Sequence, residues 1–130
     1  MALELKIGAS KKLSITINDS EGSPVDLDGD LFNKARVEVI SQFTKKIIQK
    51  WSTDATDYGG DYKRAYVNTT TNKLILYIDA SDTEDEKPTD LTIRSDVFLN
   101  SDDGDEGGNY EDDLRVIRKK GNLGRLISSR

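Results

Sequence analysis

Apolar and polar residues alternate along much of this chain, and this alternation restricts its fold more than any other feature of the sequence. Leucine and isoleucine occupy every second position from Leu3 to Ile7 and again from Leu13 to Ile17, and alanine and valine do so from residue 35 to residue 39. Successive side chains of a β-strand point to opposite faces, so this spacing places the apolar residues on one face. The pattern therefore predicts half-buried strands.

The rest of the chain extends this pattern. Residues 73–78, 91–99 and 114–120 are also strand-like, and polar turn formers separate the apolar stretches. With no convincing long helix, about seven to eight strands joined by frequent turns predict an all-β fold, an antiparallel β-sandwich with a long acidic loop. A small β-barrel is the main alternative.

Residues 43–51 allow two interpretations, because Phe43, Ile47, Ile48 and Trp51 also fit a helical stripe. We predict a strand after a turn near Thr44, since isoleucine and tryptophan favour sheets, and a short helix is the alternative.

The aromatic side chains are also open to two interpretations. We expect Trp51 to pack in the core with the three phenylalanines, Phe32, Phe43 and Phe98. A surface platform on which a ligand stacks is the alternative.

Length and composition narrow the function. The 130 residues suit one domain, residues 1–130, and the chain has no cysteine and no histidine. These absences exclude disulfides, thiolate nucleophiles and the usual general base. Paired carboxylates, as in glycosidases, would need a cleft that abundant loop aspartates do not specify. We predict a protein that is not an enzyme and binds no cofactor.

The first ten residues alternate in polarity and lack the apolar run of a signal peptide. No stretch approaches the roughly 20 apolar residues that span a bilayer. We therefore expect neither classical secretion nor a membrane partner.

Charge is unevenly distributed along the chain. Residues 1–78 carry a net charge of +1, residues 79–113 carry −12, and residues 114–130 carry +6, giving −5 overall. The stretch 101–113 is so rich in acids and glycine that it predicts a long mobile loop. After it, Gly121-Asn122 suits a two-residue turn, so residues 113–130 are predicted to form a basic hairpin or tail.

We expect the two charged segments to be contact surfaces for protein partners. The basic half comprises Arg115, Arg118, Lys119, Lys120 and Arg125, and the acidic half lies within residues 102–113 and includes Asp102, Asp103, Asp105 and Glu106. Nucleic acid is a poor partner for the cations, because the neighbouring acids would repel phosphates.

Calcium is the metal to consider for the acidic loops. Asp26-Leu-Asp-Gly-Asp30 offers closely spaced carboxylates, but Val37 stands where an EF-hand loop needs its twelfth-position glutamate. Aspartate beside glycine is also typical of ordinary turns, and the 102–113 acids suit a solvated loop. We therefore predict no metal site.

The stretch from Asn18 to Asp30 reads D-x-x-G-x-P-V-D-L-x-G between two strands. It resembles the N-terminal immunoglobulin-like modules of tailed-phage virion proteins, such as upper baseplate proteins. The resemblance covers residues 11–40 and, more loosely, 73–99. In this motif Gly22 and Pro24 reverse the chain, and Val25 and Leu27 are expected to anchor it inward.

The resemblance implies an immunoglobulin-like sandwich that is a structural protein of a phage particle: a baseplate, head–tail connector, collar or capsid decoration protein. It implies assembly with other virion proteins, and with copies of itself, in the host cytoplasm. The alternative is a bacterial β-sandwich that binds carbohydrate through Trp51 and tyrosines, or calcium through its acidic loops.

Overall fold

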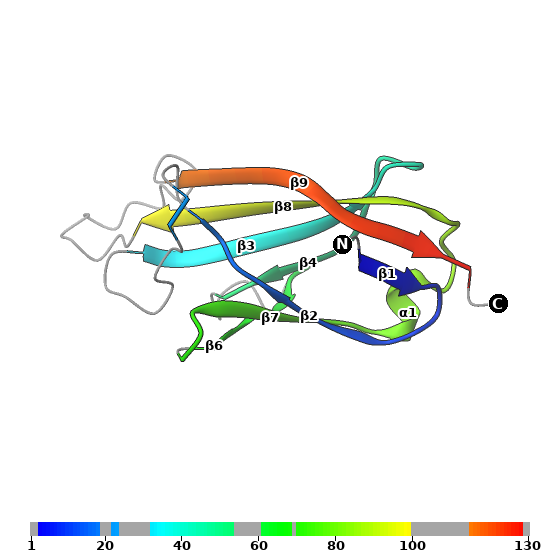
Figure 1. The fold of residues 1–130 in the computed structure, drawn as a ribbon, viewed down its shortest axis with the longest axis horizontal. Helices are drawn as coiled ribbons and strands as arrows, with labels where there is room; N and C mark the ends of the chain where they lie inside the picture. The colour runs from blue at the N-terminus through cyan, green and yellow to red at the C-terminus, as the bar shows by residue number, and fades with distance from the viewer. Residues whose placement is uncertain are drawn as a thin grey trace.

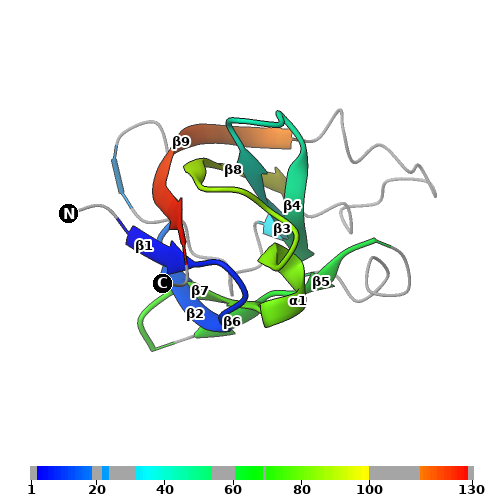
Figure 2. The same ribbon diagram turned by 90° about the vertical axis from the view of Figure 1, so that its right-hand side faces the viewer.

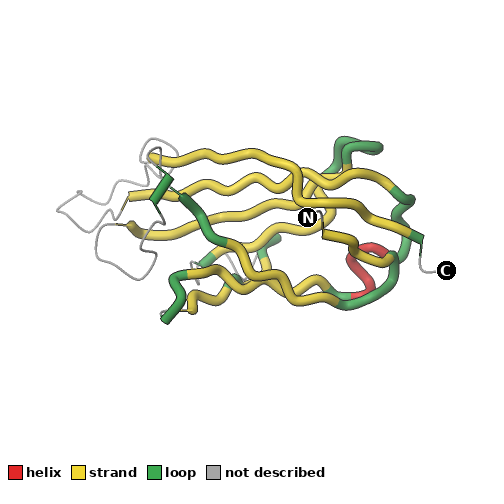
Figure 3. The backbone as a smooth tube through the Cα atoms, in the orientation of Figure 1, coloured by secondary structure: helices red, strands yellow, loops and turns green. Residues whose placement is uncertain are grey.

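The computed structural model describes residues 3–18, 22–23, 32–53, 61–68, 70–99 and 115–128, with the backbone alone for 32–34, 98–99 and 115–117. Within them the chain is all-β, apart from the single turn of helix α1 (Ala80–Thr83) (Figure 3). The strands are β1 (Leu3–Lys6), β2 (Lys11–Ile15), β3 (Phe32–Ser41), β4 (Ile47–Ser52), β5 (Lys63–Arg64), β6 (Tyr66–Asn68), β7 (Lys73–Ile78), β8 (Thr89–Leu99) and β9 (Arg115–Ile127).

Two sheets face each other (Figures 1 and 2). The large sheet has the order β1-β9-β8-β3-β4-β5, and the small sheet has the order β2-β7-β6. This two-sheet, all-β fold agrees with the sandwich prediction. The expectation of purely antiparallel pairing is wrong, because β1 pairs with β9 in parallel and β4 pairs with β5 in parallel.

The core lies between the sheets and is formed by alternate residues of both. Its buried members are Leu5, Leu13, Ile17, Ala35, Val37, Val39, Trp51, Ala65, Leu74, Leu76, Ile78, Leu91, Val97 and Leu126. The alternation of apolar residues that the sequence displays thus becomes the inner face of each sheet.

Trp51 joins the two layers. Its side chain is 0% exposed, and its indole Nε1 donates a hydrogen bond to the carbonyl of Tyr77 on β7, at 3.2 Å. The prediction that Trp51 packs in the core is confirmed, and the platform interpretation is wrong for this residue.

Phe43 departs from the core prediction, since its side chain is 67% exposed. It lies in the turn between β3 and β4, which confirms the predicted turn near Thr44 and the strand after it. Lys45 closes this turn with φ of 64°, and its N–H donates to the Ser41 carbonyl at 2.8 Å. A residue at the tip of a two-stranded turn has no second layer above it, so Phe43 stays outside the core.

The predicted turn at Gly121-Asn122 is wrong, because β9 runs straight through these residues. β8 pairs with β9 from Thr89↔Leu126 to Phe98↔Arg115, with a register shift between Leu91 and Thr92. The shift is a β-bulge that takes up the extra Leu123, and Asn122 Oδ1 accepts a bond from the Gly124 N–H at 2.9 Å. A long partner strand thus keeps the local turn formers extended.

The charged stretch after β7 is anchored to the large sheet. Lys63 Nζ, on β5, donates to the carboxylates of Asp79 and Asp82, the latter at 3.1 Å, and Gln49 on β4 also donates to Asp82 at 2.9 Å. Burial works to lower the pKa of Lys63, but the hydrogen bonds to Asp79 and Asp82 and their negative charges together raise it above 10.5.

This raised pKa has a measurable consequence. A lysine that binds its proton more tightly in the folded state stabilises the fold below its unfolded pKa, and the contribution is lost as pH rises through the folded pKa. Lys63→Met should lower the free energy of unfolding by up to about 1 kcal/mol near neutral pH, since the ion pairs are partly solvent-screened. Urea denaturation should show this gap between the variant and the wild type narrowing as the pH rises above 10.5, through the raised pKa of the folded state. A gap that is constant with pH would contradict this assignment.

Several predicted positions lie outside the described residues. These are the calcium candidate Asp26–Asp30, the motif residues Pro24, Val25 and Leu27, and the acids Asp102, Asp103, Asp105 and Glu106. Gly22 is described and has φ of +84°, a conformation that glycine adopts without strain in a turn. In the described part of the chain, no helix has the length and apolar character needed to cross a membrane.

Candidate functional site

The outer face of the large sheet carries a continuous array of charges. Residues directly opposite each other on neighbouring strands share a face, and the register aligns Lys50, Glu38, Arg94 and Lys120 in one row across β4, β3, β8 and β9. A second row across β3, β8 and β9 consists of Arg36, Asp96 and Arg118. We call these outward side chains the charged face: Arg36, Glu38, Lys50, Arg94, Asp96, Arg118 and Lys120.

Both acids of the charged face are held by arginines. Arg94 forms an ion pair with Glu38, and Arg118 forms two hydrogen bonds with Asp96, Nε to Oδ1 at 2.7 Å and Nη2 to Oδ2 at 3.3 Å. Glu38 and Asp96 are only 9% and 8% exposed. Pairing of this kind compensates the desolvation of the carboxylates and fixes the arginine heads, so the face is ordered before any partner arrives.

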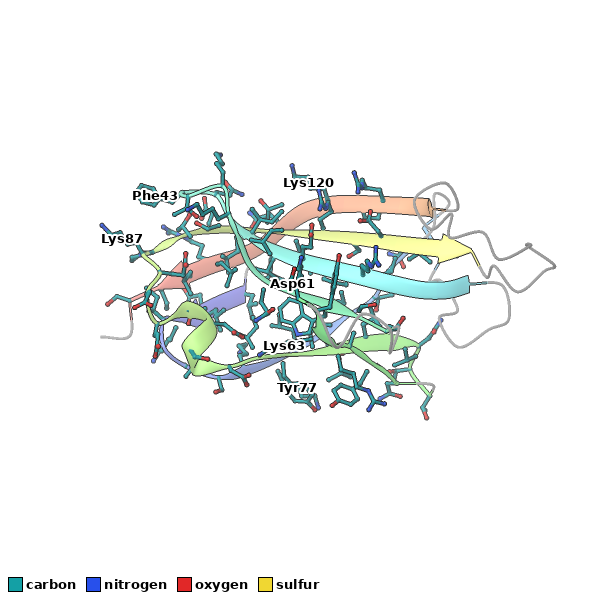
Figure 4. The ribbon with its side chains drawn as sticks, turned by 180° about the vertical axis from the view of Figure 1, so that it is seen from behind. Phe43, Asp61, Lys63, Tyr77, Lys87 and Lys120 are labelled. Carbon is teal, nitrogen blue, oxygen red and sulfur yellow. The ribbon has the colours of Figure 1, made fainter. Side chains whose placement is uncertain are left out.

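Cations outnumber acids on this face by five to two. At the β5 side, the guanidinium of Arg36 lies 5.0 Å from the ring centre of Tyr62, and Lys50 Nζ lies 4.6 Å from the same ring. Lys50 also lies 3.8 Å from the exposed carboxylate of Asp61. At the β9 side, Lys120 projects outward (Figure 4). The face therefore presents a positive surplus that a negatively charged surface would complement.

The predicted basic residues do not form one patch, because β9 is a strand and sends alternate side chains to opposite faces. Arg118 and Lys120 belong to the charged face, whereas Lys119 lies opposite the buried Ser95. Arg125 is bound by Asp90 at 3.1 Å. The backbone of Arg115 opens β9, and its side chain lies outside the described residues.

Lys119 and Lys120 are the cations of this set that remain available. Both are exposed, and neither has an ion-pair partner within the described residues. Sequence reasoning identified these two lysines but placed them in a hairpin, since the pairing of β9 with β8 is a long-range feature.

A second exposed feature is the turn between β3 and β4, residues 42–46, which we call the hairpin tip. Phe43, which is 67% exposed, projects at this turn (Figure 4). The exposed Lys45 and Lys46 follow it in the chain. The tip is braced against β8, because the Gln42 N–H donates to the Asp90 carbonyl at 3.0 Å and the Phe43 N–H donates to Thr89 Oγ1 at 2.9 Å. An exposed aromatic side chain on a braced backbone is typical of a protein–protein interface. The polar neighbours of Phe43 were the sequence signal for its exposure.

Tyrosines surround a surface depression of about 410 Å³ on the β5–β6 side, above the buried Trp51. Tyr66 and Tyr77 meet edge to face with ring centres 5.8 Å apart, and the guanidinium of Arg64 lies 4.5 Å from the ring centre of Tyr66. The ring of Tyr66 is thus already engaged by its own chain.

The described residues contain no group of three or more acidic side chains able to hold a metal ion. The acids considered for calcium in the sequence are not among these residues.

No family model, no curated protein and no solved structure matches the chain.

Proposed function

We propose that this chain is a non-enzymatic structural module of a tailed-phage particle, which docks to other virion proteins through the charged face. The observation that carries the proposal is the charged face itself, an ordered array with a positive surplus that ends at β9 in the exposed Lys120, next to the exposed Lys119 on the other face of the strand. Complementary charge across an interface steers association and fixes its register. The phage context rests on the resemblance of residues 11–40 to virion modules.

Strand order supports an immunoglobulin-like topology. In such domains one sheet contains strands C, F and G, extended in the variable type by C′, and the other contains B, E and D. The order β9-β8-β3-β4 corresponds to G-F-C-C′, and β2-β7-β6 corresponds to B-E-D. The chain departs from that type in the parallel β4–β5 pair and in having no disulfide.

The distribution of charge along the chain supports a repeated assembly. The segments of net charge −12 and +6 are paired within one chain at Arg118–Asp96 and Arg125–Asp90, and their other charges allow copies to meet through opposite charges. We therefore propose that the protein forms homo-oligomers in the particle, alongside its contacts with other virion proteins.

The two lysines at the β9 margin provide a direct test. The double variant Lys119→Glu/Lys120→Glu should bind about tenfold or more weakly to the virion proteins encoded beside this gene, because it replaces attraction by repulsion. The matched control is Lys11→Glu/Lys12→Glu, an equally charged change at two exposed lysines on β2.

Each protein would be co-expressed with the neighbouring gene products and measured by co-elution and by co-sedimentation with assembled particles. Binding by the wild type and the control variant, but not by the β9 variant, is the expected result. A wild-type protein that stays monomeric and never sediments with particles or virion proteins would refute the proposal.

The carbohydrate alternative now rests on Tyr62, Tyr66 and Tyr77, because Trp51 is buried beneath them. A ligand that binds only the folded state raises its melting temperature. A shift of several degrees with glycans or calcium, together with no binding to virion proteins, would favour that alternative over the phage proposal.

A further inference from the structure

At one edge of β9, the neighbouring strand β1 covers only part of the length of β9. β1 pairs with β9 from Leu3↔Gly124 to Lys6↔Ile127, and β8 occupies the other edge of β9. Among the described strands, none pairs with this second edge of β9 between Lys119 and Leu123. Every second residue of such an edge directs its N–H and C=O groups away from the sheet, so the edge can accept another strand.

The core is incompletely covered at this opening. Ile15, Ile93 and Leu123 are only partly buried, whereas Leu13 and Leu91, two residues away on β2 and β8, are 4% and 0% exposed. The three apolar side chains line a groove of about 380 Å³ between β2 and β9. Beside β1 the same side is closed, since Leu5 is 1% exposed there.

Gly121 keeps the groove open. It lies opposite Ile93 on β8 and lines the groove, and a Cβ added to it would meet no atom within 4 Å. A larger side chain at this position would project into the space where an incoming strand would lie.

The charged residues that line the groove are all basic. Lys119 and Lys120 line it, and none of the described lining residues is acidic. The remaining lining residues are the apolar side chains, Thr16, Ser95 and Gly121. An occupant must therefore combine apolar side chains, to cover the isoleucines, with carboxylates to meet the lysines.

We propose that this groove is a strand-acceptor site for an extended segment of a partner protein in which apolar and acidic residues alternate. The segment continues along β9 from the point where β1 ends its pairing, and it bonds to the free backbone groups of the β9 edge. Alternation suits the site, because one face of an added strand covers the core and its backbone satisfies the edge. The groove shares Lys120 with the charged face, but the proposal rests on the open edge of β9 and the partly buried Ile15, Ile93 and Leu123, so it can succeed or fail independently of the phage assignment.

An alternating valine–glutamate octapeptide is the probe, titrated into nitrogen-15-labelled protein and followed by amide NMR shifts. We expect saturable shifts that are largest at Lys119–Leu123 and Thr16. A valine–lysine octapeptide, with the same alternation and the opposite charge, should bind about tenfold or more weakly.

Two further experiments, one on the peptide and one on the protein, distinguish the addition of a strand from simple attraction between opposite charges. An N-methylated valine–glutamate peptide, with every second amide blocked on the edge facing β9, should lose binding by about tenfold or more, and methylation of the other edge should not. Gly121→Val fills the groove and leaves both lysines in place, so it should also abolish the shifts. Gly121→Ala, which adds a single methyl group in open space, is the control for the substitution, with folding checked by circular dichroism.

Equal binding of both N-methylated peptides, or retained binding by a folded Gly121→Val variant, would overturn the proposal. So would an absence of shifts with the valine–glutamate peptide. Shifts at the same residues that depend on protein concentration alone would assign the groove to a second copy of this chain, and would also overturn it.

Discussion

Trp51→Ala is expected to lower the free energy of unfolding by about 3–5 kcal/mol, the range typical of truncating a large buried aromatic side chain. Trp51 is 0% exposed, and it is the side chain through which β4 of the large sheet bonds to β7 of the small sheet. Alanine leaves a cavity between the layers and removes the hydrogen bond to the Tyr77 carbonyl. Both effects act on the same inter-sheet contact.

Two variants separate the packing contribution from the hydrogen bond. Trp51→Phe retains most of the ring and loses the Nε1 donor, so it should cost less than the alanine variant. Tyr77→Phe alters a side chain that is 46% exposed and keeps the backbone carbonyl, so it should be close to neutral. Because Trp51 is the only tryptophan, unfolding should be followed by far-ultraviolet circular dichroism in urea. A loss below about 1 kcal/mol for the alanine variant would contradict the role of Trp51 as the link between the sheets.

Gly124→Ala should destabilise the protein by about 2–4 kcal/mol. Gly124 has φ of +147°, and a Cβ at this position would lie 2.1 Å from the Leu3 carbonyl oxygen. Real side chains never approach a backbone oxygen so closely, so β1 must move away from β9. The movement breaks the parallel pairing from Leu3 to Lys6 and uncovers Leu5.

Gly121→Ala is the matched control, three positions earlier on the same strand, where an added Cβ meets nothing within 4 Å. It should change the free energy of unfolding by less than about 0.5 kcal/mol. Urea denaturation measures both variants, and hydrogen exchange of the Leu5 and Ile7 amides reports on β1 directly. Equal stabilities for the two alanine variants would show that β1 does not depend on the close approach at Gly124.

Much of the fold could be predicted from local pattern. Alternation identified the strands around Leu13, Val37 and Leu76, and the same positions line the core. The apolar spacing of residues 43–51 fitted both a helix and a strand, and the β-propensity of isoleucine and tryptophan favoured the strand that the structure contains. These successes share a cause: a side-chain period of two is a property of a strand taken alone.

The candidate site was harder to predict, because it depends on which strands are neighbours. The cations of residues 115–125 were identified as contact residues, but they were placed in a hairpin, and only the register with β8 separates Lys119 from Lys120. Glu38, Arg94 and Asp96 drew no attention in the sequence, since each is an ordinary polar position on a strand. They become a site only when β3, β8 and β9 lie side by side.

The sequence by itself therefore determined the all-β class, the positions of most strands and the segregation of charge along the chain. Tertiary structure alone decided that Trp51 is buried while Phe43 is exposed, that β9 passes through its turn-forming residues, and that one edge of β9 is left open beside Ile15. The physical reason is that burial and strand pairing are long-range properties. The alternation of side chains and the turn propensity of a residue are set by a few neighbouring residues. Which strand lies beside another depends on the packing of the whole sandwich.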